Sequence, residues 1–239
     1  MFFMAPVMNI LAVYVIAAVL PAVLLMRYVY QQDKVEPEPP ALLTSLVGMG
    51  VLAALVSIVL EMVGQSVLGR LVDPGSPTYT VALAFLVVAV VEEGSKFFFL
   101  KRRTWQDPNF NYRFDGIVYA VFVSLGFAAF ENIKYVFTYG LSVALPRALL
   151  AIPGHMGFAV FMGVFYGRAK LRADLGNPFR SWLDQAAGYL LAVLLHGFYD
   201  TCAMLGTTRA MGVFVVFVLV MYMAVFRTIR RESANDTPV

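Results

Sequence analysis

Long apolar stretches separated by short polar connections dominate the hydrophobic pattern of this chain. A helix needs about 20 consecutive apolar residues to cross the hydrocarbon core of a bilayer, and seven stretches approach that length. Pro and Gly punctuate the connections, as in Glu36–Pro40, Asp73–Pro77 and Leu175–Pro178. The pattern predicts an all-α fold, a polytopic transmembrane helix bundle of about seven spans. The expected spans are Met8–Met26, Leu42–Val63, Val81–Leu100, Gly116–Tyr139, Leu149–Gly167, Asp184–Cys202 and Ala210–Phe226.

The composition supports a protein integral to the membrane. The 239 residues are 60% hydrophobic and 14% charged, whereas an ordinary soluble domain carries about 25% charged residues. We expect residues 1–239 to form a single transmembrane helical domain with a polar core over residues 92–200. The pI of about 9.0 does not indicate nucleic acid binding, because the basic residues form short clusters at the ends of apolar stretches, as membrane topology requires.

These basic clusters also predict the orientation of the chain. The connections after the first, third and fifth expected spans and the segment after the seventh are rich in Lys and Arg, whereas the other connections carry one basic residue each: Arg70, Arg147 and Arg209. Cytoplasmic loops carry the excess of positive charge. The N-terminus is therefore expected outside and the C-terminus in the cytoplasm.

Ionisable residues inside the expected spans are few. A charged residue near the centre of a membrane helix costs about 2.5–3.5 kcal/mol, and such residues usually face the interior of a bundle and serve chemistry or transport. At about 1.5 Å per residue, polar groups of four spans fall near the midplane or in the outer half. Those four spans carry Glu92, Glu131, His155 and His196. The full set of ionisable residues inside the expected spans is Glu61, Glu92, Glu93, Lys96, Glu131, Lys134, His155, His196 and Asp200.

Helical spacing brings several of these residues onto shared faces. Lys96 follows Glu92 by four positions and Glu93 by three, so its ammonium can pair with either carboxylate. The adjacent glutamates point about 100° apart, which lets one react while the other supports it. His196 and Asp200 are four apart, so the carboxylate can orient the imidazole.

Each residue also has a purely structural interpretation. His155 alone could make an interhelical hydrogen bond, and Glu61 and Lys134 are close enough to span ends to cap or to reach the interface. A structural pair of Glu92 with Lys96 leaves Glu93 unexplained. Together, on four helices, these groups favour a functional site.

Four motifs in order resemble those of a known family. They are Glu92-Glu93-x-x-Lys96, the segment Phe127–Asn132 followed by Tyr135, His155 within Pro153–Gly157, and His196-x-x-x-Asp200. This pattern resembles the PrsW-type intramembrane proteases, relatives of the CAAX prenyl proteases and of bacteriocin-processing membrane proteases. Those relatives often carry His and Asn where this chain has Glu131 and Asp200, and the extra acid keeps a bound metal among the alternatives.

The resemblance implies a peptidase that hydrolyses a peptide bond within or beside the membrane. In this family the reaction is the first, extracytoplasmic cleavage of a membrane-bound anti-sigma factor. The implied partners are a single-span membrane protein substrate and the lipid bilayer, with no nucleic acid, and the implied location is the bacterial cell (inner) membrane.

Hydrolysis needs a base for the attacking water and donors for the oxyanion. Glu92 or Glu93 is the candidate base, with Glu92 preferred and Lys96 holding the paired charge. His155 and His196 are candidates to donate to the oxyanion or to protonate the leaving amine. Asp200 and Glu131 complete the candidate catalytic set, because Asp200 would fix the imidazole of His196 and Glu131 would orient water or a partner group. The supporting residues are Lys96 and Asn132.

Two alternatives use the same residues. No cofactor is expected for the mechanism above, but a zinc metalloprotease could draw its ligands from separate helices although no His-Glu-x-x-His helix is present. Its ligands would be His155, His196, Glu93 and Asp200. A small proton-coupled transporter could relay protons through these groups, although the sequence has no sign of the inverted repeats typical of transporters.

Overall fold

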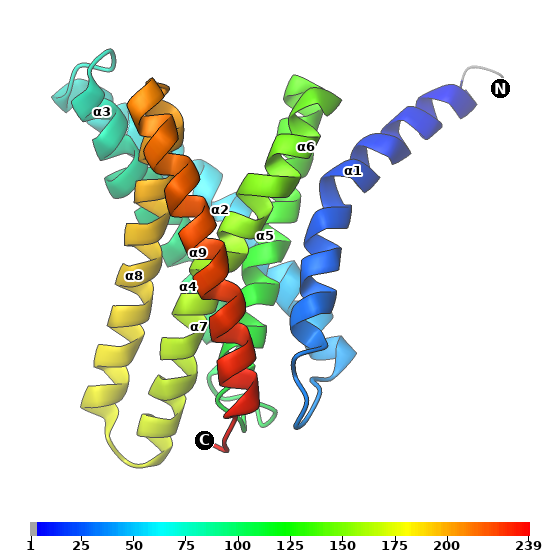
Figure 1. The fold of residues 1–239 in the computed structure, drawn as a ribbon, viewed down its shortest axis with the longest axis vertical. Helices are drawn as coiled ribbons and strands as arrows, with labels where there is room; N and C mark the ends of the chain where they lie inside the picture. The colour runs from blue at the N-terminus through cyan, green and yellow to red at the C-terminus, as the bar shows by residue number, and fades with distance from the viewer. Residues whose placement is uncertain (1–3) are drawn as a thin grey trace.

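A computed structural model of the protein describes the backbone of residues 4–239 and the side chains of residues 11–239. This part of the chain consists of long helices packed side by side (Figure 1). In this range the only β-type pairing is an isolated bridge between Tyr112 and Pro238. The elements are α1 (Met4–Tyr30), α2 (Pro40–Leu71), α3 (Pro77–Ala82), η1 (Leu83–Ala89), α4 (Val90–Thr104), α5 (Asp115–Tyr139), η2 (Leu141–Val143), α6 (Ala144–Pro146), η3 (Arg147–Ala151), α7 (Ile152–Asp174), α8 (Pro178–Leu205) and α9 (Thr208–Ala234).

The predicted all-α, polytopic membrane fold is confirmed. Six helical stretches within the described residues are long and apolar enough to cross a membrane: Leu11–Tyr30, Pro40–Leu71, Asp115–Tyr139, Leu141–Asp174, Pro178–Leu205 and Thr208–Ala234. The remaining expected span runs through α3, η1 and α4 as one continuous helical path. It contains the paired glutamates and packs against α2 and α8.

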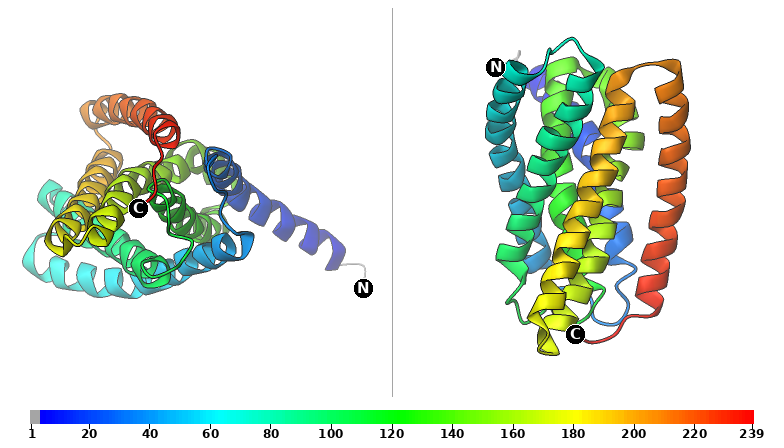
Figure 2. Two further views of the ribbon diagram at one scale, coloured as in Figure 1. Left: turned by 90° about the horizontal axis from the view of Figure 1, so that it is seen from below. Right: turned by 90° about the vertical axis from the view of Figure 1, so that its left-hand side faces the viewer.

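The connections rich in basic residues and those with one basic residue lie at opposite ends of the bundle, as the alternation of charge along the chain predicted. The α1–α2, α4–α5 and α7–α8 connections and the C-terminus lie at one end, and the α2–α3 and α8–α9 connections lie at the other (Figures 1 and 2). The basic clusters therefore gather at a single end. Which end faces the cytoplasm stays a prediction.

Local sequence explains where several helices begin and end. The side chains of Ser76 and Asn177 each accept the backbone N–H of the residue three positions on, which caps α3 and α8. Pro77 and Pro178 follow at the first helical position, where a missing N–H costs nothing. Gly206, with φ of 62°, ends α8 in the left-handed conformation that glycine adopts without strain.

Helix α5 lies at the centre of the bundle, and glycines bring it into backbone contact with α7. A Cβ atom at Gly163 would lie 2.6 Å from the carbonyl oxygen of Gly116 and 2.6 Å from the Cα of Ile117. Small residues at helix interfaces allow such close approach in membrane proteins. This contact fixes α7, which carries His155, against α5, which carries Glu131.

Two stretches of wider, π-type helix directly precede the helices that carry the site. Segment η1 comes just before Glu92 and Glu93, and η3 just before His155. Helical turns of this type often occur at functional sites. The apolar pattern of both stretches gave no sign of them.

Candidate active site

The ammonium of Lys96 lies at the centre of a buried polar cluster. Its Nζ is 3.1 Å from Oε2 of Glu92, 2.8 Å from Oε1 of Glu93 and 3.0 Å from Nδ1 of His155, and it lies 4.1 Å above the ring centroid of Phe127. An ammonium has only donors. The Nδ1 of His155 is therefore the acceptor, and its Nε2 carries the proton.

That proton connects His155 to a second charged group on α5. Nε2 of His155 is 3.2 Å from Oε2 of Glu131, and Nη2 of Arg147 is 2.7 Å from the same oxygen. Nε of Arg147 donates to Oδ1 of Asn132 at 2.8 Å, and the guanidinium lies 3.8 Å from the ring centroid of Tyr135. Arg147 thus joins η3 to two adjacent side chains of α5.

His196 on α8 lies between two carboxylates. Its Nδ1 is 2.8 Å from Oε1 of Glu93, and its Nε2 is 3.4 Å from Oδ2 of Asp200. The ring stacks on Phe158 with a centroid distance of 4.8 Å and an interplanar angle of 18°. Because each ring nitrogen faces an oxygen acceptor, either one is placed to carry a proton.

A cavity of about 580 Å³ opens beside this cluster. Its polar lining includes Glu61, Glu92, Glu131, Lys134, Arg147, His155, His196 and Asp200, and its apolar lining includes Leu150, Phe158, Met204, Met211 and Phe214. Glu92 lines the cavity, whereas Glu93 is 0% exposed and lies behind it, held by Lys96 and His196. The adjacent glutamates therefore occupy different environments.

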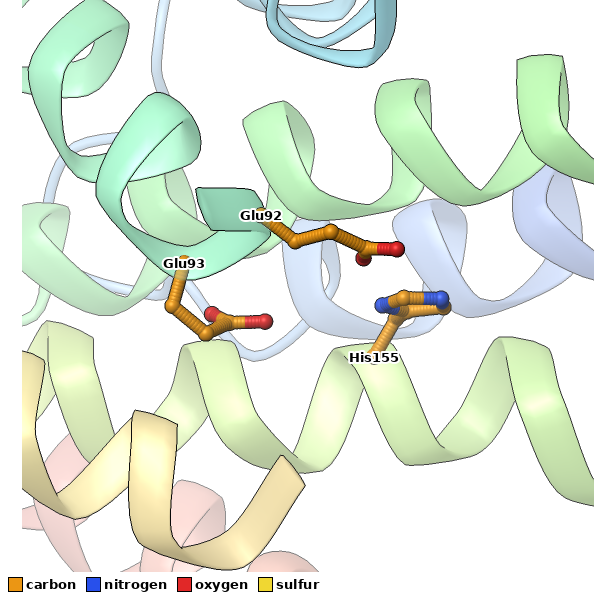
Figure 3. A group of neighbouring side chains, drawn as sticks. All are labelled: Glu92, Glu93 and His155. Carbon is orange, nitrogen blue, oxygen red and sulfur yellow. The ribbon is translucent and has the colours of Figure 1, made fainter. Parts of the chain in front are cut away.

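The same cluster offers donors for a metal ion. One oxygen each of Glu92 and Glu93 and one ring nitrogen of His155 lie within 4.8 Å of one another (Figure 3). Oε2 of Glu93 is buried without a hydrogen-bond partner among the described residues. Two carboxylates and an imidazole suit a catalytic divalent metal, so the donor set fits. The Lys96 ammonium contacts these same three side chains and would have to give up its place to the ion.

The structure gathers most of the residues singled out from the sequence. Glu92, Glu93, Lys96, His155 and His196 form one contact network. Glu131 joins it through His155, and Asp200 lies beside His196. The side chain of Asn132 makes no direct hydrogen bond to any of these residues: its amide donates to the carbonyl of Ala18 at 2.8 Å, and its oxygen accepts from Arg147, which also bonds Glu131.

Three further residues belong to the cavity. Glu61 and Lys134 line it, although their positions near span ends had also suggested capping or contact with the membrane interface. Arg147 was interpreted only as a single basic residue in an outer connection, and instead it is bonded to Glu131 and Asn132. The available signal was a basic residue six positions before the Pro153–Gly157 motif.

Comparisons with known proteins show the family of this chain. The family described as "PrsW family intramembrane metalloprotease" matches residues 38–226. Protease PrsW of Geobacillus kaustophilus is 33% identical over 93% of this chain and 93% of its own length. The protein of the same name from Clostridioides difficile is 29% identical over 86% of this chain and 85% of its own length. The one from Bacillus subtilis is 32% identical over 77% of this chain and 79% of its own length. No solved structure matches significantly.

The fold and the site therefore define an integral membrane peptidase that acts on a membrane-bound substrate in the lipid bilayer. The chain belongs to the PrsW family of intramembrane proteases. The resemblance inferred from the four motifs is confirmed. The family is described as one of metalloproteases, and this chain has a matching group of acidic and histidine side chains.

Proposed function

We propose that this protease makes the extracytoplasmic cut in a single-span membrane protein of the anti-sigma-factor type. One observation carries the proposal: Glu92 lines a cavity together with His155 and His196, while Glu93 and Lys96 lie behind it. Such a cavity offers a base and hydrogen-bond donors around one space, which peptide hydrolysis requires.

The lining of the cavity supports a lipophilic substrate segment. Leu150, Met204, Met211 and Phe214 give it apolar lining in addition to the carboxylates and histidines. These residues come from η3, α8 and α9, so a substrate helix would approach between those elements. Its scissile peptide must unwind at the polar wall, because a helical carbonyl is already hydrogen-bonded.

In this mechanism Glu92 accepts a proton from water as the water oxygen bonds to the scissile carbonyl carbon. The oxyanion accepts a hydrogen bond from the imidazole of His196, since the one N–H of His155 is already donated to Glu131. Glu92 then passes its proton to the departing nitrogen as the C–N bond breaks, which yields a carboxylic acid and an amine. Asp200 holds the ring of His196 in position, and Glu131 does the same for His155.

The donor set also supports a metal-dependent form of the same reaction. Glu92, Glu93 and His155 would hold the ion, with His196 joined to it through Glu93 and Asp200 beside that ring. A bound Zn²⁺ supplies Lewis-acid polarisation of the carbonyl and activation of water. In this form Lys96 turns away from the three ligands and its charge is replaced by that of the ion.

Purified full-length protein in liposomes, incubated with candidate single-span membrane proteins, tests the proposed substrate. Mass spectrometry should find one cut in or next to the span, on the extracytoplasmic side. A control is Asp174→Asn, which removes only the surface pair with Lys170 and should cleave at the wild-type rate. Cuts confined to the cytoplasmic portion of every substrate would contradict the proposal.

Elemental analysis with a chelator control decides between the two forms of the reaction. The metal-dependent form predicts about one zinc per chain, loss of cleavage on chelation and recovery with Zn²⁺, with less zinc retained by His155→Ala. Full activity of metal-free protein in chelator would exclude this form and leave Glu92 as the base.

A further inference from the structure

A second group of buried acids lies far from the candidate active site, at the end of the bundle that holds the C-terminus (Figure 1). Asp33 and Glu38 belong to the α1–α2 connection, and Asp115 begins α5. They are only 5%, 3% and 1% exposed. One carboxylate oxygen from each lies within 4.8 Å of the other two.

Protein donors satisfy only part of this group. Oδ2 of Asp115 accepts the backbone N–H groups of Asn111 at 3.0 Å and Tyr112 at 2.7 Å, and Oε1 of Glu38 accepts the hydroxyl of Tyr119 at 2.6 Å. Oδ2 of Asp33 and Oε2 of Glu38 are buried without a hydrogen-bond partner in the described part of the chain. Two acceptors are thus left over in a space enclosed by carboxylates.

No basic side chain balances this charge among residues 11–239. None of the ion pairs there includes Asp33, Glu38 or Asp115, and the nearby Arg103 and Arg113 pair instead with Asp107 and Glu232. Burial, reinforced by the charge of Asp236, raises the pKa of Asp33 to about 6. Burial raises the pKa of Glu38 to about 7. Unpaired buried carboxylates are costly to ionise, and this cost is relieved by a bound cation.

We propose that Asp33, Glu38 and Asp115 bind a hard divalent cation, Mg²⁺, Ca²⁺ or Mn²⁺. Oxygen-only donors select these ions over zinc and copper, which prefer nitrogen and sulfur. Two charges on the ion offset two of the three carboxylates, and water completes the coordination that three side chains leave open.

The ion would fasten three parts of the chain that meet at this end. The view from below in Figure 2 shows the C-terminus beside the start of α5. Oδ1 of Asp236 accepts the N–H of Phe114 at 2.9 Å, and the hydroxyl of Ser233 donates to the carbonyl of Gln32 at 2.5 Å. The α1–α2 connection, the start of α5 and the C-terminal segment therefore already contact one another around the acids.

Electron paramagnetic resonance of Mn²⁺ tests the site on purified full-length protein in detergent. Glu92→Gln/Glu93→Gln removes two donors of the candidate active site, so saturable binding of about one Mn²⁺ per chain in this background supports the second site. Adding Asp33→Asn/Glu38→Gln should weaken that binding at least about tenfold, because ligand charge sets the affinity of oxygen sites. Competition by Mg²⁺ and Ca²⁺ then identifies the preferred ion.

Two controls keep the result decisive. Asp174→Asn in the same background should bind Mn²⁺ as the background does. If Asp33→Asn/Glu38→Gln does not fold, Glu38→Asp, which keeps the charge and shortens the ligand, should show the weakened binding. Absence of saturable Mn²⁺ binding in the Glu92→Gln/Glu93→Gln background, or binding unchanged by the acid substitutions, would overturn the proposal. Neither result depends on peptide cleavage, so failure here is separate from failure of the proposed function.

Discussion

At the scale of residues, the two adjacent glutamates differ because of what surrounds them. Glu92 lines the cavity, whereas Glu93 is fully buried against Lys96 and His196. Helical geometry alone predicted that they point in different directions, and it predicted the pairing of Lys96 with both. It did not decide which glutamate faces the cavity, since that depends on the position of α8, about one hundred residues away in sequence.

Arg147 gives a residue-scale prediction. Arg147→Met should lower kcat of cleavage about 10- to 100-fold, because Glu131 and Asn132 lose the group that orients them, an effect of the size seen for supporting groups at metal sites. Arg147→Lys should recover only part of the lost kcat, since one ammonium cannot replace the guanidinium, which bonds Glu131 and Asn132 at the same time. Steady-state kinetics on a membrane substrate measures both variants.

The matched control is Arg209→Met, which changes an exposed basic residue in the first turn of α9, at the same end of the bundle. It should keep the wild-type kcat. Equal effects of the two substitutions would assign Arg147 to membrane topology rather than to the site. The contacts of Arg147 were not predicted, because they depend on how η2, α6 and η3 fold back against α5.

At the scale of elements, the apolar pattern located the helices but not their ends. Helix α2 continues to Leu71 beyond the expected Val63, and α8 begins at Pro178 before the expected Asp184. Helices extend past the hydrocarbon core with polar residues, so hydropathy marks the membrane-spanning part only. The π-type turns of η1 and η3 have no hydropathy signal at all.

The α5–α7 contact gives an element-scale prediction. Gly163→Ala should destabilise the protein by about 1–3 kcal/mol, the usual cost of overpacking, because its Cβ would lie 2.6 Å from backbone atoms of Gly116 and Ile117. Gly212→Ala in α9 meets nothing within 4 Å and should be neutral or slightly stabilising. Thermal unfolding in detergent compares the two, and equal midpoints would contradict the close packing.

At the scale of the whole molecule, the alternation of basic residues predicted which connections share an end, and the structure agrees. The buried acids at that end were not predicted. Asp33 and Glu38 look like ordinary loop residues in sequence, and only the folding of α5 against the α1–α2 connection buries them.

Orientation in the membrane gives a molecule-scale prediction. Cys202 is the only cysteine, so Cys202→Ala provides a background for single cysteines. Ser76→Cys, in the α2–α3 connection, should react in intact cells with a membrane-impermeant maleimide. Asn177→Cys, at the opposite end, should react only after the cells are opened. The reverse pattern would invert the topology and place the proposed cut on the cytoplasmic side.

The buried acids also predict how stability depends on pH. Asp33 and Glu38 have pKa values of about 6 and about 7 in the folded protein, above the usual value of about 4. Raised carboxyl pKa values stabilise the fold at low pH, and this contribution is lost as pH rises through about 6–7. The charges of Asp236 and Glu36 also raise the pKa of Asp33, and the charges of Asp33 and Asp107 raise that of Glu38, whereas a hydrogen bond with Asp115 lowers the pKa of Glu38.

In chelator, the thermal unfolding midpoint of the wild-type protein should therefore decrease as the pH is raised from 5.5 to 8. The decrease should be a few degrees larger than in Asp33→Asn/Glu38→Gln, since about 1 kcal/mol of stability shifts the midpoint of a protein of this size by roughly 2–4 °C. A divalent cation should reduce the fall in the wild type alone. Parallel pH profiles of the two proteins would contradict the burial of these acids as described.

The rate of substrate cleavage by Glu92→Gln decides whether Glu92 is the catalytic base. In liposomes with one mapped membrane substrate, we expect Glu92→Gln to cleave about 10²–10⁴-fold more slowly than wild type, because a positioned general base contributes that much. Asp174→Asn should cleave at the wild-type rate, and the unfolding midpoint of Glu92→Gln should stay close to that of the wild type. Cleavage by folded Glu92→Gln at the wild-type rate would contradict this role of Glu92.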